Sequence, residues 1–376
     1  MSLQSIYISG FKSIRELDFE LRPLNVLIGA NGSGKSNFIL VFEMLNAIID
    51  KRLQTFSGRY GAETLLYFGY KTTQTIKLEL AFDRGSSQYQ NGYVVELVPS
   101  NRNTLIFESE GVWFHDRSQY SQHGPTLWIG YGNSETELYK VSSQTDRRLV
   151  VDYVIAALSD WRVYHFHDTS ASAPVKATHN INDNDYLRSD ASNLAAFLYR
   201  LRETRRPYYD RIVKSVALVA PFFEDFALRP NPLNENNIRL EWREKGSDAY
   251  FDGSMFSDGT LRFICLATLL LQPELPSVIL IDEPELGLHP YAITQLAGLL
   301  RSASKQTQVI VSTQSVPLIN QFTPEDIVVV DRRNGQSEFQ RLESDQLTDW
   351  LKEYGLGDLW EKNVLGGRPQ LWEPHP

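Results

Sequence analysis

The 376-residue sequence predicts an α/β fold with a mixed β N-terminal lobe, a helical insertion and a mainly parallel core sheet. An apolar run at 24–28 precedes a glycine-rich turn and an apolar helix, which is a strand–loop–helix unit. Period-two runs between about residues 75 and 138 indicate an antiparallel meander. In the last third of the chain, helical and strand patterns alternate, as in βαβ units with a parallel sheet.

The whole chain, 1–376, is expected to form one unit with four consecutive parts. The hydrophobic period becomes helical between about residues 182 and 220, and "DIVVVDRR" followed by "SEFQRLES" predicts a hairpin. "LTDWLKEYGL" predicts a final helix before a loose tail. The predicted parts are an N-terminal lobe with the glycine-rich loop and the meander (1–170), a helical insertion (171–250), a core segment (251–335), and the hairpin, helix and tail (336–376).

The bulk composition is that of an ordinary globular protein, with 42% hydrophobic and 22% charged residues. A net charge of −9 gives no global attraction to nucleic acid, although a local basic patch would still bind it. The single cysteine, Cys265, excludes a disulfide framework or a cysteine zinc site within one chain, and it is expected to be a buried thiol. No signal-peptide core or membrane-length apolar run is present, so we expect a cytoplasmic protein without a membrane partner.

The stretch "GANGSGKS" contains the complete phosphate-loop pattern, which is a glycine, four residues, and then Gly34, Lys35 and Ser36. Glycines let backbone N–H groups converge on phosphate oxygens, Lys35 supplies a positive charge, and Ser36 offers its hydroxyl to Mg²⁺. The flanking strand and helix are the structural context that this pattern requires. The residues expected around the nucleotide are Gly29, Ala30, Asn31, Gly32, Ser33, Gly34, Lys35, Ser36 and Asn37.

The second chemical element is "VILIDEPELGLHP", an apolar strand that ends in two acids. Asp282 would hold the hydrated Mg²⁺, as acids at this place do in phosphate-loop enzymes. Glu283 would orient or deprotonate an attacking water. The alternative interpretation is an exposed acidic strand end without a ligand.

The third element is "SMFSDGTLRF", a polar turn that opens an almost wholly apolar helix about 220 residues beyond the phosphate loop. Ser257 is expected to cap the helix, and a helix N-terminus favours an anion. Gly259 would permit close approach of that anion. The alternative is a capped core helix that meets no ligand.

These motifs resemble, in their order along the chain, the ABC-type ATPase heads of the RecF, SMC and OLD group. The segments that carry the resemblance are "FKSIRELDFELRPLNVLIGANGSGKSN", "FSDGTLRF", "DEPELGLHP" and "VIVSTQS", and the chain is most similar to short members without coiled-coil arms. The resemblance implies ATP and Mg²⁺ as ligands and an ATP-dependent homodimer that sandwiches two ATP molecules. Ser257, Asp258 and Gly259 of one head would then cap the γ-phosphate held by the other.

Two positions depart from the pattern of the wider ABC group. Asp258 stands where transporter signatures commonly have glycine, and it places an acid near phosphate. Gln314 stands where ABC ATPases often have a histidine that contacts the γ-phosphate and the catalytic water. A glutamine hydrogen-bonds both but carries no proton charge, so hydrolysis is expected to be slow, with Glu283, Lys35 and Gln314 as the catalytic residues. The alternative for Gln314 is a polar residue that merely ends a strand.

Two groups of histidines allow several interpretations. In "HFHD", His165 and His167 face the same side of a strand, with Asp168 beyond them. They would act near the nucleotide, pack as ordinary side chains, or hold a metal. His289 would either contact the partner across a dimer or start the local helix.

Basic residues are concentrated in "RLRETRR" near a helix end. They would contact DNA phosphates or an acidic partner, or they would form a solvated face favoured by the helix dipole. These residues are Arg200, Arg202, Arg205 and Arg206.

Two classes of function therefore compete. The first is a slowly hydrolysing ATP switch whose dimer controls an effector protein encoded nearby, as in phage defence. The second is a DNA-binding ATPase of DNA repair or genome maintenance. The acidic net charge and the absence of coiled-coil arms argue against the DNA-binding ATPase, and Gln314 favours the ATP switch. The order of the motifs argues against a phosphate-loop kinase, and the remaining acids show no two-metal nuclease spacing.

Overall fold

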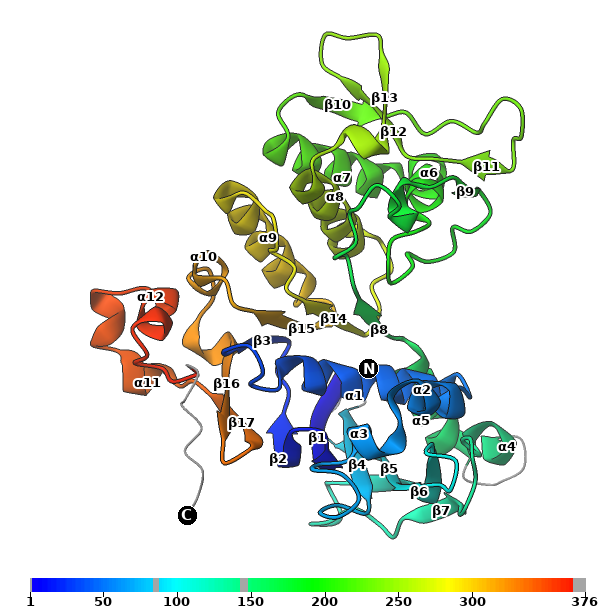
Figure 1. Cartoon of the computed structure of the whole chain (residues 1–376), viewed down its shortest axis with the longest axis vertical. Coiled ribbons are helices and arrows are strands. Elements are labelled where there is room, and N and C mark those ends of the chain that lie inside the picture. Colours follow the sequence, from blue (N-terminus) through cyan, green and yellow to red (C-terminus); the bar gives the residue numbers. More distant parts are fainter. Residues whose placement is uncertain (1, 84–87, 143–147, 368–376) are drawn as a thin grey trace.

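The computed structural model describes residues 2–83, 88–142 and 148–367, and two six-stranded sheets dominate it (Figure 1). The first sheet is antiparallel throughout, in the order β2-β1-β4-β5-β6-β7, which confirms the predicted meander. Its strands are β1 (Ser2–Phe11), β2 (Ile14–Glu20), β4 (Ile76–Asp83), β5 (Tyr89–Pro99), β6 (Leu105–Asp116) and β7 (Leu127–Gly130).

The second sheet is parallel except at one edge, in the order β17-β16-β3-β15-β14-β8. Only β17 runs antiparallel to its neighbour, as the second strand of a hairpin. The strands are β3 (Leu24–Ile28), β8 (Trp161–Tyr164), β14 (Val278–Asp282), β15 (Gln308–Thr313), β16 (Ile327–Arg333) and β17 (Gln336–Arg341). The predicted α/β class with a mainly parallel core is confirmed, and residues from both ends of the chain build that core.

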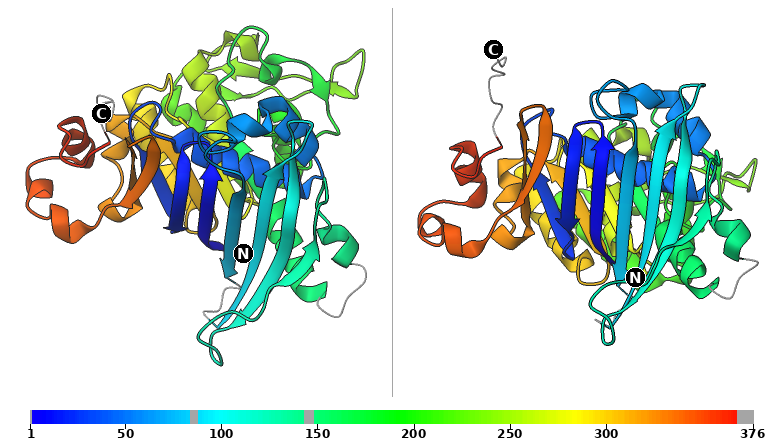
Figure 2. Two further views of the ribbon diagram at one scale, coloured as in Figure 1. Left: turned by 60° about the horizontal axis from the view of Figure 1, so that its bottom comes forward. Right: turned by 90° about the horizontal axis from the view of Figure 1, so that it is seen from below.

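Helix α1 (Lys35–Ile49) belongs to the layer between the two sheets, whereas α8 (Asp258–Leu271) and α9 (Pro290–Ala303) cover the other face of the parallel sheet (Figure 1). Strand side chains alternate between faces. Leu280 therefore packs in the core that contains α1, while Ile279 packs in the core that contains α8 and α9. Figure 2 shows the antiparallel strands side by side with helices behind them.

The remaining helices range from 4 to 14 residues in length. Their bounds are α2 (Leu53–Tyr60), α3 (Ala62–Leu65), α4 (Leu138–Ser142), α5 (Arg148–Ser159), α6 (Leu194–Thr204), α7 (Arg206–Val219), α10 (Val316–Ile319), α11 (Ser344–Leu347) and α12 (Leu356–Glu361). Within the described ranges, no helix is long and apolar enough to cross a bilayer. Cys265 of α8 is buried, and burial raises the pKa of its thiol to about 12.

The segment expected to be a helical insertion, 171–250, contains α6 and α7 but also short strands. Trp242 explains part of this arrangement, because its ring stacks on Phe251 and Phe256 with centroid separations of 4.8 and 4.5 Å. Trp242 therefore connects two of these strands to Phe256, which lies just before α8. The short strands of this segment are β9 (His179–Asn180), β10 (Phe223–Phe226), β11 (Asn237–Ile238), β12 (Glu241–Glu244) and β13 (Tyr250–Asp252).

The C-terminal part differs from the expectation of one final helix at 347–356. The chain instead forms α11, a 3₁₀ turn and α12, which begins at Leu356. A Cβ on Gly357 would lie 2.5 Å from the carbonyl oxygen of Val316, and the Gly357 N–H donates to Asn320 Oδ1 at 2.7 Å. The first turn of α12 therefore packs closely on α10, which excludes a side chain at residue 357, and Asn320 at the end of α10 accepts one of its N–H groups. The predicted loose tail, 366–376, begins with docked residues, and 368–376 lie outside the described part.

Candidate nucleotide site

The glycine-rich loop between β3 and α1 is fixed by close backbone packing. Gly34 has φ 118°, and a Cβ there would lie 2.0 Å from Ser337 Oγ. A Cβ on Gly29 would lie 2.1 Å from the carbonyl oxygen of Val330. A Cβ on Gly32 would meet no described atom within 4 Å, so this side of the loop is open. The chain thus forms a rigid loop with one open side.

Lys35 places a buried ammonium inside this loop. The residue is 5% exposed, and its Nζ donates to the carbonyl oxygens of Gly29 at 2.7 Å and Ala30 at 3.0 Å. Burial lowers the pKa of Lys35, while the acids of the site oppose that shift. The buried hydroxyl of Ser33 has no hydrogen-bond partner among the described residues. A buried cation beside an unpartnered donor in an open-sided loop fits the phosphates of a nucleotide.

Ser36 and Asp282 meet at the carboxyl edge of the parallel sheet. The Ser36 hydroxyl donates to Asp282 Oδ2 at 3.3 Å. Parallel strands bring their carboxyl ends to one edge, so the end of β14 faces the loop that follows β3. Hydroxyl and carboxylate oxygens are suitable ligands for Mg²⁺, and these two residues are the ones that would hold it.

Gln314 connects the phosphate loop to the acid that follows Asp282. Its Nε2 donates to Asn31 Oδ1 at 2.6 Å and to Glu283 Oε1 at 2.7 Å. Glu283 has φ 41°, and its N–H donates to the Ser312 carbonyl at 2.8 Å. Such a φ is uncommon for a residue other than glycine and is typical of functional turns. Gln314 therefore does more than end β15, because it contacts both the loop and the predicted base.

Glu285 and Thr313 contact each other at this edge of the sheet, and the sequence did not predict them as site residues. Thr313 Oγ1 donates to Glu285 Oε1 at 2.5 Å, and burial raises the pKa of Glu285. The "DEPE" stretch contains Glu285, but only the structure shows that it contacts β15.

Ser13 and Ser337 connect the loop to both sheets and were also missed. The Ser337 N–H donates to the Ser13 carbonyl at 2.7 Å, and the two hydroxyl oxygens are 2.7 Å apart. Ser337 Oγ also donates to the Ser33 carbonyl at 2.5 Å, and Asn37 Nδ2 donates to Ser13 Oγ at 2.7 Å. No local pattern predicts that residue 337 touches the phosphate loop.

The predicted signature residues make their contacts elsewhere in the chain. Ser257 caps α8, with its Oγ accepting from the Thr260 N–H at 3.2 Å. A Cβ on Gly259 would lie 2.3 Å from the Gly287 carbonyl oxygen, so glycine here is already required by packing within the chain. Asp258 pairs with Lys176 at 3.8 Å. The start of α8 is thus capped within the chain, and none of these contacts joins it to the phosphate loop.

The histidines after β8 lie close to the charges of the nucleotide site. His165 Nε2 is 2.9 Å from Glu43 Oε1, and this hydrogen bond raises the pKa of His165. Burial lowers the pKa of His167, while the charge of Asp282 opposes that shift. Asp168 Oδ1 accepts hydrogen bonds from the N–H and the hydroxyl of Ser170. In the described part of the chain, no group of three His, Cys, Asp or Glu side chains is arranged to hold a metal.

His289 acts at a helix start, where its Nδ1 accepts from the Tyr291 N–H at 3.3 Å. This contact supports the local interpretation of His289. The arginine cluster is largely engaged within the chain. Arg200 donates to the carbonyls of Asn184 and Asp185, Arg202 pairs with Glu203, and Arg206 pairs with Asp210.

The fold and site define a phosphate-loop ATPase head of the RecF, SMC and OLD type. A match to the family described as "AAA domain, putative AbiEii toxin, Type IV TA system" covers residues 24–320, and the chain belongs to this family. Phosphate-loop ATPases of this kind generally bind ATP with Mg²⁺.

Two curated relatives are nucleases. The chain is 24% identical to the OLD nuclease of Thermus scotoductus, over 88% of this chain and 62% of that protein. It is 23% identical to the Old nuclease of Escherichia phage P2, over 85% of this chain and 57% of that protein. The chain therefore spans about three fifths of the length of these relatives.

The fold is similar to that of solved Smc heads. One is an Smc head bound to the C-winged helix domain of ScpA, with a TM-score of 0.61 and 16% identity, covering 93% of this chain and 100% of that chain. Another is the Pyrococcus furiosus Smc head with an extended coiled coil bound to the C-terminal domain of ScpA. Its TM-score is 0.56 at 16% identity, covering 94% of this chain and 99% of that one. At this identity the similarity concerns the fold alone.

Proposed function

We propose that this chain binds and slowly hydrolyses ATP, and that ATP drives two copies into a head-to-tail dimer that acts as a switch. The observation that carries this proposal is the division of the motifs. Ser36, Asp282 and the Asn31–Gln314–Glu283 contacts converge at one edge of the parallel sheet. The capped start of α8 makes its own contacts with Thr260 and Lys176 instead. A second copy would bring its α8 to the open side of the loop.

Each residue of the phosphate edge has a distinct task in this proposal. Lys35 and the loop N–H groups hold the phosphates, and Ser36 with Asp282 would hold Mg²⁺. The bound metal would neutralise charge that develops on the phosphate oxygens. Glu283 orients the attacking water and accepts its proton, and the Gln314 amide holds that carboxylate in place. Because the amide carries no positive charge, hydrolysis is slow.

The partner copy would supply the start of α8. Ser257, Asp258 and Gly259 would face the γ-phosphate held by the first copy, where the positive end of the helix dipole favours an anion. The Ser257 hydroxyl accepts from the Thr260 N–H and lies 2.9 Å from Thr260 Oγ1, where either hydroxyl can donate. When Thr260 is the donor of that pair, the Ser257 proton can be donated to phosphate.

The most favoured target of the switch is an effector protein. The family description refers to a toxin–antitoxin system, and the arginine cluster that could have met DNA is largely paired within the chain. A DNA target is the second candidate, because both curated relatives are nucleases. DNA binding that requires ATP and weakens with salt would favour the second, whereas co-purification with the product of a neighbouring gene would favour the first.

The test of the dimer is the solution mass of the Glu283→Gln protein, measured by light scattering with and without Mg-ATP. This change should slow hydrolysis and keep the metal ligands, so that a monomer becomes a stable dimer with ATP. Adding Ser257→Arg should prevent the dimer, whereas Ser121→Arg, at an exposed bend between β6 and β7, should not. Dimerisation of the Ser257→Arg protein, or undiminished hydrolysis by a strictly monomeric form, would refute the composite site.

A further inference from the structure

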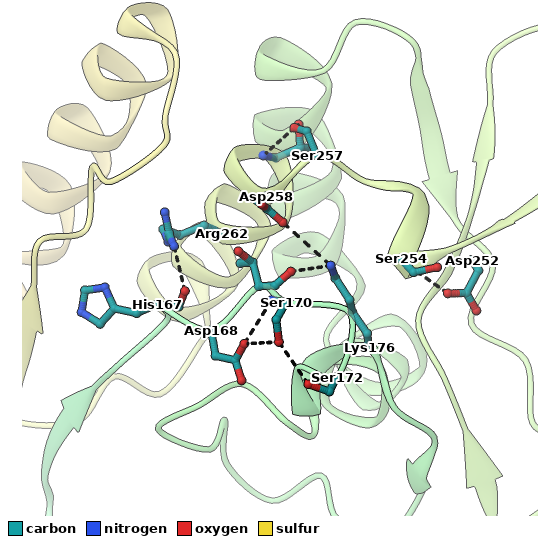
Figure 3. A network of polar contacts seen from close by, with 12 residues as sticks. His167, Asp168, Ser170, Ser172, Lys176, Asp252, Ser254, Ser257, Asp258 and Arg262 are labelled. Atoms are coloured by element: carbon teal, nitrogen blue, oxygen red, sulfur yellow. Dashed lines mark hydrogen bonds and ion pairs between the residues drawn. The ribbon is translucent and has the colours of Figure 1, made fainter.

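The acid in the predicted signature has a buried basic partner. Asp258 is the first residue of α8, and its side chain is 68% exposed. Lys176 Nζ lies 3.8 Å from Asp258 Oδ1, and the Lys176 side chain is only 9% exposed (Figure 3). A nearly buried ammonium thus sits beneath the turn that would face the phosphate of another copy.

The loop that follows β8 holds Lys176 in this place. Lys176 ends a 3₁₀ turn, and its Nζ donates to the Thr169 carbonyl at 2.5 Å. Arg262 of α8 contacts the same loop, because it donates to the His167 carbonyl at 3.0 Å (Figure 3). It also donates to the Phe166 carbonyl at 2.8 Å. Lys176 Nζ therefore lies between the Thr169 carbonyl and the Asp258 carboxylate.

Charge explains why such a partner is needed. An ionised Asp258 would repel an incoming γ-phosphate, because like charges a few ångströms apart disfavour each other. Arg262 lies four residues further along α8 and also attracts Asp258. However, its guanidinium already donates to two carbonyls. Among the described residues, Lys176 forms an ion pair with Asp258 at 3.8 Å.

We propose that Lys176 is a positioning residue of the composite site, which neutralises Asp258 so that the start of α8 accepts the γ-phosphate of a second copy. The inference rests on the proposed ATP-driven dimer and deepens it. It accounts for the aspartate at the second signature position, because the acid and the buried lysine form one neutral unit. Ser257 and the free N–H groups of the first turn then provide the phosphate contacts.

A purely structural role for Lys176 predicts a different pattern of variants. If Lys176 served only to hold the Thr169 carbonyl, removing the charge of Asp258 would not compensate for its loss. If Lys176 serves to neutralise Asp258, removing both charges together should leave the monomer–dimer equilibrium nearly unchanged. Lys176→Arg keeps the charge and is the conservative control.

The experiment measures the ATP-dependent monomer–dimer equilibrium in the Glu283→Gln background, by light scattering over a concentration series with Mg-ATP. Lys176→Met should weaken the dimer roughly five- to tenfold, the size expected for one unpaired charge in a partly exposed site. Lys176→Arg should match the parent within about twofold, and the Lys176→Met/Asp258→Asn double variant should recover to a similar level. Binding of a fluorescent ATP analogue to the monomer should be unchanged in all of them.

The outcomes distinguish a failure of the proposed dimer from a failure of the proposed role of Lys176. A parent protein that stays monomeric with ATP refutes the dimer itself, and with it the role of Lys176. A parent that dimerises while Lys176→Met has no effect refutes only the role of Lys176. A double variant as weak as Lys176→Met also refutes it, because the loss would then be structural. Recovery by Asp258→Asn supports neutralisation.

Discussion

Replacing Gly34 by alanine tests whether the phosphate loop is as tightly enclosed as its geometry indicates. Gly34 has φ 118°, a conformation that costs a residue with a Cβ about 1–3 kcal/mol. The new Cβ would also lie 2.0 Å from Ser337 Oγ and 2.7 Å from Ser337 Cβ. Relieving such an overlap in a packed region costs a further ~1–3 kcal/mol. We therefore expect Gly34→Ala to lower the free energy of unfolding by about 2–6 kcal/mol in total.

Gly32→Ala is the matched control for this change. Gly32 also has a positive φ, of 78°, but a Cβ there meets no described atom within 4 Å. Both substitutions restrict the unfolded chain equally, so that effect cancels in the comparison. The difference between the two variants should be at least about 1 kcal/mol, because Gly34→Ala adds the overlap and its φ lies further from the left-handed helical region.

Urea denaturation followed by circular dichroism measures both free energies, provided the slopes of the transitions agree. Introducing Ser337→Gly removes the two nearest atoms that the new Cβ would meet and leaves Ser13 Oγ at 3.0 Å, so the cost of Gly34→Ala should then fall toward that of Gly32→Ala. Equal costs for Gly34→Ala and Gly32→Ala in the wild-type background would refute the reasoning. So would a Gly34→Ala cost that Ser337→Gly leaves unchanged.

Two further predictions concern the edge of the site. Gln314→Ala removes the amide that joins Asn31 and Glu283. The steady-state rate of ATP hydrolysis should therefore fall at least about tenfold, while the affinity for ATP changes less than about threefold. Equal losses of hydrolysis rate and of ATP affinity would contradict the assigned role. The hydrogen bond that His165 donates to the Glu43 carboxylate raises the pKa of His165. It therefore stabilises the fold below the unfolded pKa of about 6.5, and this contribution is lost as the pH rises through the folded value. Glu43→Gln should therefore flatten the loss of unfolding free energy between about pH 6 and pH 8, whereas parallel pH curves for variant and wild type would contradict the assignment.

The parts of the site that the sequence predicted are those that a local pattern determines. A strand, a glycine loop and a helix place Lys35 and Ser36 together without any distant contact. The apolar strand that ends at Asp282 adds the third residue, because parallel strands share a carboxyl edge. The meander between β4 and β7 was predictable for the same reason, since each hairpin pairs neighbours in sequence.

The parts that were missed depend on contacts between distant segments. Ser337 reaches Ser13 across more than 300 positions, and that contact depends on the register of β17. Lys176 lies in an irregular loop with no hydrophobic period, so nothing local relates it to Asp258. The break before α12 arises because Gly357 packs on α10, which a helical period cannot reveal.

These distant contacts have a consequence for how a nucleotide would act. The loop is bonded to the turn after β1 through Ser13, to β17 through Ser337, and to the C-terminal segment, where the Ala30 N–H donates to the Gly367 carbonyl at 2.8 Å. Lys35 occupies its interior by bonding two loop carbonyls. Contacts within the chain thus hold the loop on several sides, so little of the binding free energy of a phosphate would be consumed in ordering it. In the proposed switch, that free energy instead favours the approach of a second α8, so dimerisation should respond to ATP far more than the fold of the single chain does.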